Sequence, residues 1–322
     1  ITMKLENIFL SILLVFSFNI FASDINITEG ETYFSVTNKT LSEFSFINSV
    51  SDVTTMIVKT EEGEFVKLIV PAYGSDSKDG DAELPVLQKL IRVPFGSEIV
   101  VKIINLEEKI IKLSDYGFSI PVFPNQPSVS KSATDIPFYF NEEYYNLEKF
   151  TGNNIVETKL LGRMRGQQLA RLSVSPFSYN PTTNELKVVT KVEVKVIFKN
   201  IDINADNENR IKYYSPEFES LFKTCVNNTP ITGKDVITTY PVKYVIISDP
   251  LFETVLQPFI DWKKKKGFLV VEGYTNNPLV GNTTASIYAF LKDMYDNASS
   301  ANPAPTYLLV VGDLAEVPSF NG

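Results

Sequence analysis

The chain has 322 residues, of which 44% are hydrophobic and 21% are charged. This composition fits two ordinary globular domains and excludes a disordered or fibrous chain. The net charge of −8 argues against nucleic acid or an anionic membrane surface as a partner. The chain contains no histidine, so these residues cannot assemble a Ser-His-Asp or Cys-His catalytic arrangement or a histidine-based zinc site.

The first 22 residues have the layout of a secretory signal peptide. Lys4 supplies a positive charge, residues 8–18 are apolar apart from two serines, and residues 20–22 end in a small residue. We expect cleavage between Ala22 and Ser23, and therefore an exported protein, secreted or at the cell surface, with no membrane span after signal removal. The alternative is an uncleaved N-terminal anchor. A single cysteine in an exported chain favours a bacterial protein over a disulfide-stapled domain.

Residues 23–200 are expected to form a β-sandwich domain. In residues 191–198 (KVEVKVIF), Val192, Val194, Val196 and Phe198 alternate with polar side chains, as in a strand with one buried face. Residues 64–70, 98–104 and 170–177 are further β-rich runs, and turns rich in Pro, Gly and Asn separate them. Many short strands without long helical periodicity are typical of a β-sandwich.

Residues 201–242 are expected to be a polar connector. Residues 200–214 are rich in Asn and Asp, which predicts an exposed loop. Ser215 and Pro216 are typical of the N-cap and first position of a short helix. That helix would place four side chains on one face, namely Phe218, Leu221, Phe222 and Cys225. A lone cysteine there is more typical of a small buried side chain than of a nucleophile.

From residue 243 onward the hydrophobic period changes. Residues 243–248, 268–273 and 306–311 are continuous apolar strands, and two helices, 251–266 and 283–297, separate them. The first helix places Leu251, Val255, Phe259 and Trp262 on one face. This β-α-β-α-β order predicts the first part, residues 243–322, of a doubly wound parallel α/β domain. We expect that sheet to be truncated, with the helices of its second face missing.

Several familiar chemistries are absent from the α/β part. The turn after its first strand has no glycine-rich nucleotide fingerprint, and the chain has no phosphate loop and no G-x-S-x-G elbow. The four lysines at 263–266 could bind an anion, but a basic helix end is the simpler interpretation. Asp313 lies at the carboxyl end of the last strand, where an active-site carboxylate could lie, and a helix cap or loop anchor explains it equally well.

Two regions of the chain resemble the gingipain family of cysteine peptidases. Residues 257–274 (QPFIDWKKKKGFLVVEGY) and 305–320 (PTYLLVVGDLAEVPSF) resemble the start of its catalytic domain. Residues 81–103, 121–132 and 160–198 resemble its propeptide, including an R-G pair and a P-F-x-Y-N-P turn in the same order. The resemblance covers nearly the whole chain after the signal peptide.

The resemblance implies an exported cysteine endopeptidase made as a zymogen, with a caspase/gingipain-like α/β catalytic domain. Its His-Cys dyad would lie downstream of residue 322, so no catalytic residue is carried over and the chain by itself should be inactive. The propeptide would contact its own catalytic domain, inhibit it and assist its folding, and protein or peptide substrates would be the partners of the full-length enzyme. No cofactor is expected, although the resemblance leaves calcium open.

One loop is the best candidate for inhibition. Residues 124–137 (PNQPSVSKSATDIP) contain three prolines that disfavour regular structure, and Lys131 is their only cation. If the enzyme prefers a basic side chain, as the resemblance implies, Lys131 would fill its specificity pocket. A solvated loop charge is the alternative interpretation, and Arg163 and Arg165 are the rival cations.

Maturation is expected in the connector, after Arg210 or Lys212, because polar exposed segments are where proteolysis concentrates. Lys223 and Lys234 are alternatives. Two other functions stay open at this stage. One is a non-proteolytic secreted β-sandwich protein for binding or surface attachment, and the other is a transpeptidase of the same family that attaches proteins to the cell surface.

Overall fold

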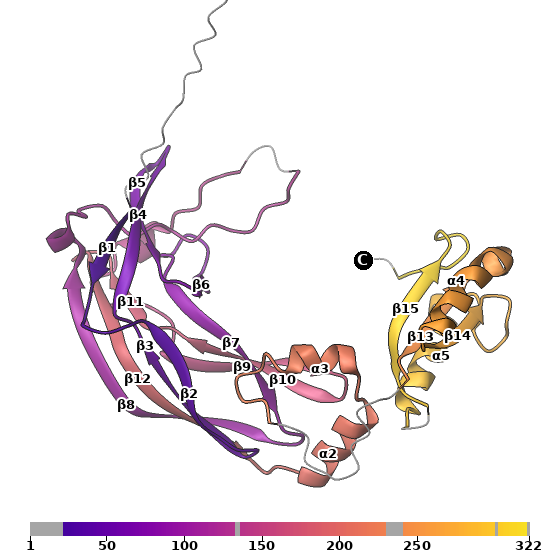
Figure 1. Cartoon of the computed structure of the whole chain (residues 1–322). Coiled ribbons are helices and arrows are strands. Elements are labelled where there is room, and N and C mark those ends of the chain that lie inside the picture. The colour runs from indigo at the N-terminus through magenta and orange to yellow at the C-terminus, as the bar shows by residue number, and fades with distance from the viewer. Residues whose placement is uncertain (1–21, 133–135, 230–240, 300–301, 321–322) are drawn as a thin grey trace, which may run out of the picture.

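The chain folds into an all-β part, two short connecting helices and a small α/β part (Figure 1). The computed structural model describes residues 22–132, 136–229, 241–299 and 302–320. The predicted signal peptide lies outside these ranges except for Ala22, where the first strand begins. No helix within the described ranges is long and apolar enough to cross a bilayer.

The all-β part consists of antiparallel sheets built around one long central strand, β12 (Glu185–Lys199). One edge of β12 pairs with β8 (Glu98–Lys112), and its other edge pairs with β11 (Phe177–Asn180) and β3 (Glu43–Ser49). The remaining strands are β1 (Ala22–Asn26), β2 (Tyr33–Lys39), β4 (Asp52–Thr60), β5 (Gly63–Ile69), β6 (Gly74–Ser75), β7 (Pro85–Val93), β9 (Val156–Met164) and β10 (Gln167–Val174). Three short helical turns, η1 (Leu113–Tyr116), α1 (Glu142–Tyr145) and η2 (Pro250–Phe252), complete the connections of the chain.

Two smaller sheets cover the β12 sheet and create the β-sandwich that the sequence predicts. The sheet β1-β4-β5 packs over one end, and the sheet β6-β7-β10-β9 packs over the other. Val192, Val194, Val196 and Phe198 are all buried in the second core, so the predicted alternation is confirmed. The alternation is a reliable signal here because successive strand side chains must point to opposite faces.

Residues 200–214 of the connector differ from their prediction as an exposed loop. The connector contains α2 (Ile203–Lys212) and α3 (Pro216–Phe222), and both pack on the β-sandwich. Asp202 caps α2 through its side chain, and Asp206 and Arg210, four residues apart, are buried on one side of the helix. Local composition misled the prediction because tertiary ion pairing outweighs the low helix propensity of Asn and Asp.

Helix α3 begins where the sequence predicts, at Ser215 and Pro216, but its buried face is narrower. Phe222 and Cys225 pack against Leu169, with Phe218 partly buried beside them. Leu221 is exposed, so its assignment to the apolar face was wrong.

The α/β part has the predicted order of elements. Its strands β13 (Lys243–Ser248), β14 (Leu269–Tyr274) and β15 (Pro305–Val311) form a parallel sheet in the order β14-β13-β15. Helix α5 (Thr284–Asp296) packs on the face of Val245 and Ile247, whereas α4 (Glu253–Lys265) contacts the opposite face through Phe259 and Tyr244. The expectation that one face lacks helices was therefore wrong. A right-handed crossover to each side of β13 necessarily places the two helices on opposite faces.

Much of the apolar surface of the α/β part is uncovered among the described residues. Leu251 in η2 and Val255 in α4, both on the predicted inner face of the helix 251–266, are 77% and 71% exposed. Strand β15 lies at the edge of the sheet and exposes Leu308 and Val310.

This exposure predicts that residues 240–322 do not fold alone. Their apolar faces and open strand edge leave too little buried area to offset chain entropy. Residues 23–229, which contain the β-sandwich with α2 and α3, are expected to melt cooperatively. Circular dichroism melts of the two pieces measure this, and a sharp melt of residues 240–322 alone would contradict it.

Candidate functional site

The loop between Pro124 and Asn141 leaves the β-sandwich on two fixed stems. The Gln126 side chain bridges the stems, since its Nε2 donates to the Tyr139 carbonyl (2.9 Å) and its Oε1 accepts from the Tyr139 N–H (3.0 Å). The Gly80 N–H donates to the Asn125 carbonyl, and the Gly80 carbonyl accepts from the Asn141 N–H. Gly80 has a φ of +84°, and a Cβ there would lie 3.0 Å from the Asn141 nitrogen, so glycine is required for this contact.

Aromatic rings pack beneath the loop stems. Phe65 contacts the rings of Phe123, Phe138 and Phe140, and Phe140 stacks on Tyr145 with ring centroids 4.4 Å apart. Ring packing and the stem hydrogen bonds fix the base of the loop while its far end extends away from the sandwich (Figure 1). The prediction that the prolines keep this segment out of helices and strands is confirmed for its described residues.

Lys131 lies at the exposed far end of this loop. It occupies a turn beside Ser130 and Ser132, whose hydroxyls are 2.9 Å apart. Within the described residues it has no ion-pair partner. The loop therefore presents a cationic side chain on a rigid base, which is a geometry suited to insertion into a complementary pocket.

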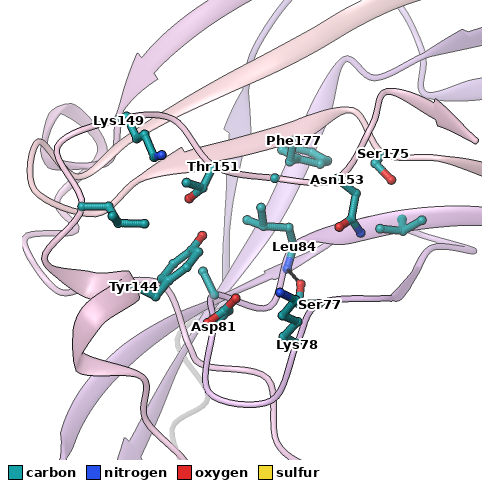
Figure 2. A pocket seen from close by; sticks show the side chains of 14 residues that line it. Ser77, Lys78, Asp81, Leu84, Tyr144, Lys149, Thr151, Asn153, Ser175 and Phe177 are labelled. Carbon is teal, nitrogen blue, oxygen red and sulfur yellow. Dashed lines mark hydrogen bonds between the residues drawn. The ribbon is translucent and has the colours of Figure 1, made fainter.

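A pocket of about 300 Å³ lies beside the stems (Figure 2). Figure 2 shows Asp81, Tyr144 and Thr151 around it, with the Ser77 hydroxyl accepting from the Leu84 N–H. The Asp81 carboxylate accepts from Asn141 Nδ2 at 2.6 Å, and burial raises the pKa of the Tyr144 phenol. Its lining holds no paired nucleophile and base, so we interpret the pocket as part of the loop support.

The carboxyl edge of the parallel sheet gathers polar side chains after each strand. Asp249 follows β13, accepts from the Leu251 N–H (2.8 Å) and lies 3.4 Å from the Thr275 hydroxyl after β14. Asp313 follows β15, and its carboxylate accepts from the Leu314 N–H (2.6 Å) within its own turn. Asp313 thus acts as a loop anchor in this structure. Sequence reasoning missed Asp249, although it directly follows a buried strand, the same signal that identified Asp313.

The lysine run at the end of α4 is occupied by intramolecular contacts. The Lys263 ammonium lies 4.5 Å from the Tyr244 ring centroid and 4.9 Å from that of Phe268, and it also faces Phe259 and Trp262. Lys264 pairs with Glu272 at 3.1 Å. Burial alone would raise the pKa of Glu272, but hydrogen bonds led by the one from Lys264 lower it. These contacts favour the basic helix end over an anion site.

The structure places the two processing candidates differently. Arg210 is 3% exposed inside α2, and its guanidinium donates to the Thr229 carbonyl (2.8 Å). Burial and the nearby Arg92 lower the pKa of Arg210 to about 10. This placement counts against Arg210, because proteases need an exposed and locally extended segment.

Lys212 is half-buried at the end of α2, where its ammonium donates to the Asp296 carbonyl (2.7 Å). Lys223 is exposed just after α3. Lys234 lies outside the described residues.

The two rival cations of the pro-region lie on the β9–β10 hairpin and have fixed partners. Arg163 is exposed on β9 and lies over the Phe95 ring at 5.0 Å. Arg165 is 6% exposed and donates to backbone carbonyls, so it cannot enter another pocket in this conformation. Lys131 and Arg163 are both exposed, but Arg163 lies over an aromatic ring, so Lys131 is the less constrained of the two.

Cys225 is buried at 3% exposure between α3 and the β-sandwich. Burial raises the pKa of its thiol to about 11, with a smaller opposing effect of Arg92. A reactive cysteine needs the opposite shift, so Cys225 fits the structural role that the sequence predicts. Among the described residues, no three or more Cys, Asp or Glu side chains are grouped so that they could hold a metal ion.

Two family models match the chain in tandem. Residues 35–213 match Propeptide_C25, and residues 237–321 match Peptidase family C25. Lys-gingipain of Porphyromonas gingivalis is 33% identical over 279 residues, which are 86% of this chain. The chain belongs to the gingipain family, peptidase family C25. It contains a gingipain propeptide followed by the first part of a C25 peptidase domain.

Another curated gingipain and a solved structure are also similar to this gingipain-family chain. Gingipain R2 of P. gingivalis is 24% identical over 76% of the chain. A solved structure described as "Structural insight into zymogenic latency of gingipain K from Porphyromonas gingivalis" matches with a TM-score of 0.53 and 32% identity, covering 55% of this chain and 98% of that one. The chain spans only 16% of the length of Lys-gingipain and 32% of gingipain R2.

The buried thiol leads to a prediction about reactivity. Cys225 in the folded chain is expected to react with iodoacetamide at pH 8 at least roughly tenfold more slowly than in the urea-unfolded chain, because its pKa is raised. The same shift removes stability as pH rises from about 9, where the unfolded thiol ionises, through about 11. Equal alkylation rates in the folded and unfolded chains would contradict the buried placement.

Proposed function

We propose that the chain is the inhibitory pro-region and initial catalytic segment of an exported gingipain-like cysteine endopeptidase made as a zymogen. The observation that carries this proposal is the loop from Pro124 to Asn141, which presents Lys131 on a rigid base. The tandem match to a propeptide and a peptidase model supports it. Export through the predicted leader at residues 1–22 is part of the proposal.

The chemistry requires groups beyond this chain. A cysteine thiolate would attack the scissile carbonyl, an imidazole would protonate the leaving amine, and backbone N–H groups would hold the oxyanion. The chain has no histidine, so we place the dyad outside these 322 residues and expect the chain alone to be inactive. Thiol-dependent hydrolysis of lysine or arginine peptides by residues 23–322 would contradict this. Independence from any cofactor stays a prediction.

Lysine is the side chain that the pro-region would offer to the enzyme. The relative named Lys-gingipain is 33% identical to this chain, against 24% for gingipain R2. This difference agrees with Lys131 as the cation at the exposed end of the loop. The full-length enzyme would then bind Lys131 as it binds a substrate lysine, while the fixed stems limit cleavage by resisting the extended geometry of a substrate.

Inhibition of the mature full-length enzyme by residues 23–229 tests this role. Lys131→Ala is expected to weaken inhibition roughly thirtyfold, equivalent to about 2 kcal/mol for a lost pocket-filling cation. Lys131→Arg separates the need for charge from the need for lysine. Lys39→Ala, at an exposed lysine on β2, is the matched control and should leave the inhibition constant unchanged. An unchanged constant for Lys131→Ala would mean that another segment blocks the cleft.

Maturation is expected within the connector, between the two family-matched regions or at the end of the first. Lys212 is the stronger of the two original candidates because Arg210 is buried, and Lys223 and Lys234 are the alternatives. N-terminal sequencing of the secreted mature enzyme measures the site. A mature enzyme whose first residue lies before residue 200 would contradict cleavage in the connector. Recovery of the protein only inside the cell, with its leader still attached, would contradict export.

A further inference from the structure

The turn between β9 and β10 has an unusual residue for its backbone shape. Arg165 and Gly166 form a two-residue hairpin turn with φ values of +50° and +70°. Turns of this shape need positive φ at both positions, where Asn, Asp and Gly are preferred. An arginine at the first position introduces backbone strain, and strain of this kind persists where the side chain has a task.

The Arg165 side chain joins three segments of the chain. Its Nε donates to the Tyr213 carbonyl (2.9 Å), Nη1 to the Pro305 carbonyl (2.6 Å) and Nη2 to the Tyr214 carbonyl (3.3 Å). The rings of Phe218 and Tyr295 lie 5.4 and 5.7 Å from the guanidinium. Pro305 and Tyr295 belong to the α/β part, so this buried cation of the pro-region is held partly by the peptidase segment.

Contacts around Arg165 extend this junction. Tyr213 stacks on Tyr295 with ring centroids 4.8 Å apart and an interplanar angle of 17°. The Lys212 ammonium donates to the Asp296 carbonyl at the end of α5, where the helix dipole favours a cation. The hydroxyls of Ser215 and Thr306 are 3.2 Å apart. We call this set of residues, Arg165, Lys212, Tyr213 and Ser215 with Tyr295, Asp296, Pro305 and Thr306, the anchor.

Backbone features on both sides of the anchor allow the two parts to approach each other closely. A Cβ on Gly166 would lie 2.4 Å from Cδ2 of Tyr213, so the turn can approach the ring only as glycine. On the other side, the pairing of β13 with β15 shifts by one residue, which leaves Thr306 as an extra residue between the partners Pro305 and Tyr307. Such bulges redirect side chains at the ends of strands.

The anchor lies at the amino-terminal edge of the parallel sheet. Pro305 is the first residue of β15, and Asp296 is the last residue of α5, which leads back toward that edge. Chemistry in parallel α/β sheets is built at the opposite, carboxyl edge. A pro-region held at the amino-terminal edge leaves the carboxyl edge open to be approached by a separate loop.

We propose that Arg165 anchors the pro-region to the amino-terminal edge of the peptidase sheet, through contacts that a cut in the connector after Lys223 or Lys234 leaves in place. The proposal rests on the proposed function only in that it calls the β-sandwich the pro-region and the α/β part the peptidase segment. The contacts of the anchor involve residues up to Phe218 on one side and from Tyr295 on the other, so none is lost when the connector is cut after Lys223 or Lys234. In this proposal Arg165 attaches the pro-region to the peptidase part, and Lys131 inhibits the enzyme.

The experiment cuts the full-length protein at a specific protease site introduced after Lys234 and measures the association of the pro-region with the peptidase part by size exclusion and dilution. The wild-type pieces are expected to co-elute. Arg165→Gln should weaken their association roughly thirtyfold or more, as expected for a buried arginine at the centre of an interface. Arg165→Lys should also weaken it, because an ammonium cannot reproduce three forked hydrogen bonds.

Arg163→Gln is the matched control, since Arg163 lies two residues away on the same hairpin and contacts Phe95 of the pro-region. It should leave association unchanged. Tyr295→Leu tests the other side of the junction without altering the β-sandwich, and its effect should not add fully to that of Arg165→Gln. In the uncut chain, Arg165→Gln should accelerate hydrogen exchange of residues 303–311 about tenfold relative to Arg163→Gln.

The outcomes are decisive whether or not the full-length protein is a peptidase, because no measurement uses catalysis. Separation of the wild-type pieces, co-elution of the Arg165→Gln pieces at wild-type affinity, or equal weakening by Arg163→Gln would each overturn the anchor. If Arg165→Gln lost its β-sandwich circular dichroism spectrum, the Arg165→Lys and Tyr295→Leu results would decide instead. A failed Lys131 experiment with an intact anchor would count against the inhibitory loop alone.

Discussion

A buried ion pair between Arg92 and Asp206 is the interaction on which the arrangement of the two parts depends. Arg92 on β7 also donates to Gln167 at 2.8 Å, and Asp206 on α2 accepts from the Phe95 N–H at 2.9 Å. Both side chains are almost fully buried. Loss of one partner from a buried pair costs about 3–5 kcal/mol, because the other charge is left buried and unpaired, so the two elements are constrained to stay together.

That pairing fixes the position of everything that follows α2. The helix ends at Lys212, so its docking sets where Lys212 and Tyr213 meet the end of α5. The side chain of Asn227 accepts from the Arg92 N–H and donates to the Arg92 carbonyl, which returns the chain to β7 after α3. The described connector residues up to 229 are therefore a folded part of the pro-region, and they carry one half of the junction with the peptidase segment.

The loop that carries Lys131 and the junction that carries Arg165 use a cation in opposite ways. Lys131 is exposed at the end of a loop whose stems are fixed, so its ammonium stays accessible to a pocket. Arg165 is buried among carbonyl oxygens and aromatic rings, which satisfy a planar guanidinium but would not satisfy an ammonium as well. Attachment and inhibition are thereby separated in one small domain.

Sequence patterns predicted the parts of the site whose signals are local. The prolines of residues 124–137 predicted a segment outside helices and strands, and the polar residue after the strand 306–311 predicted Asp313 at a loop position. Asp249 has the same signal and was missed. No local pattern could show that Arg165 meets Pro305, because 140 residues separate them in the sequence.

The sequence by itself determined the two-domain order, the alternation of β12 and the β-α-β-α-β succession, because these follow from periods of two and 3.6 residues along one segment. Tertiary structure alone decided that residues 203–212 form a helix, that α4 and α5 lie on opposite faces, and that Arg210 is buried. Each of these depends on a partner that is distant in the sequence. The helix depends on its ion pair with the β-sandwich, the placement of α4 and α5 depends on the crossovers between the parallel strands, and the burial of Arg210 depends on packing against the β-sandwich. Composition carries no information about such a partner until the chain has folded.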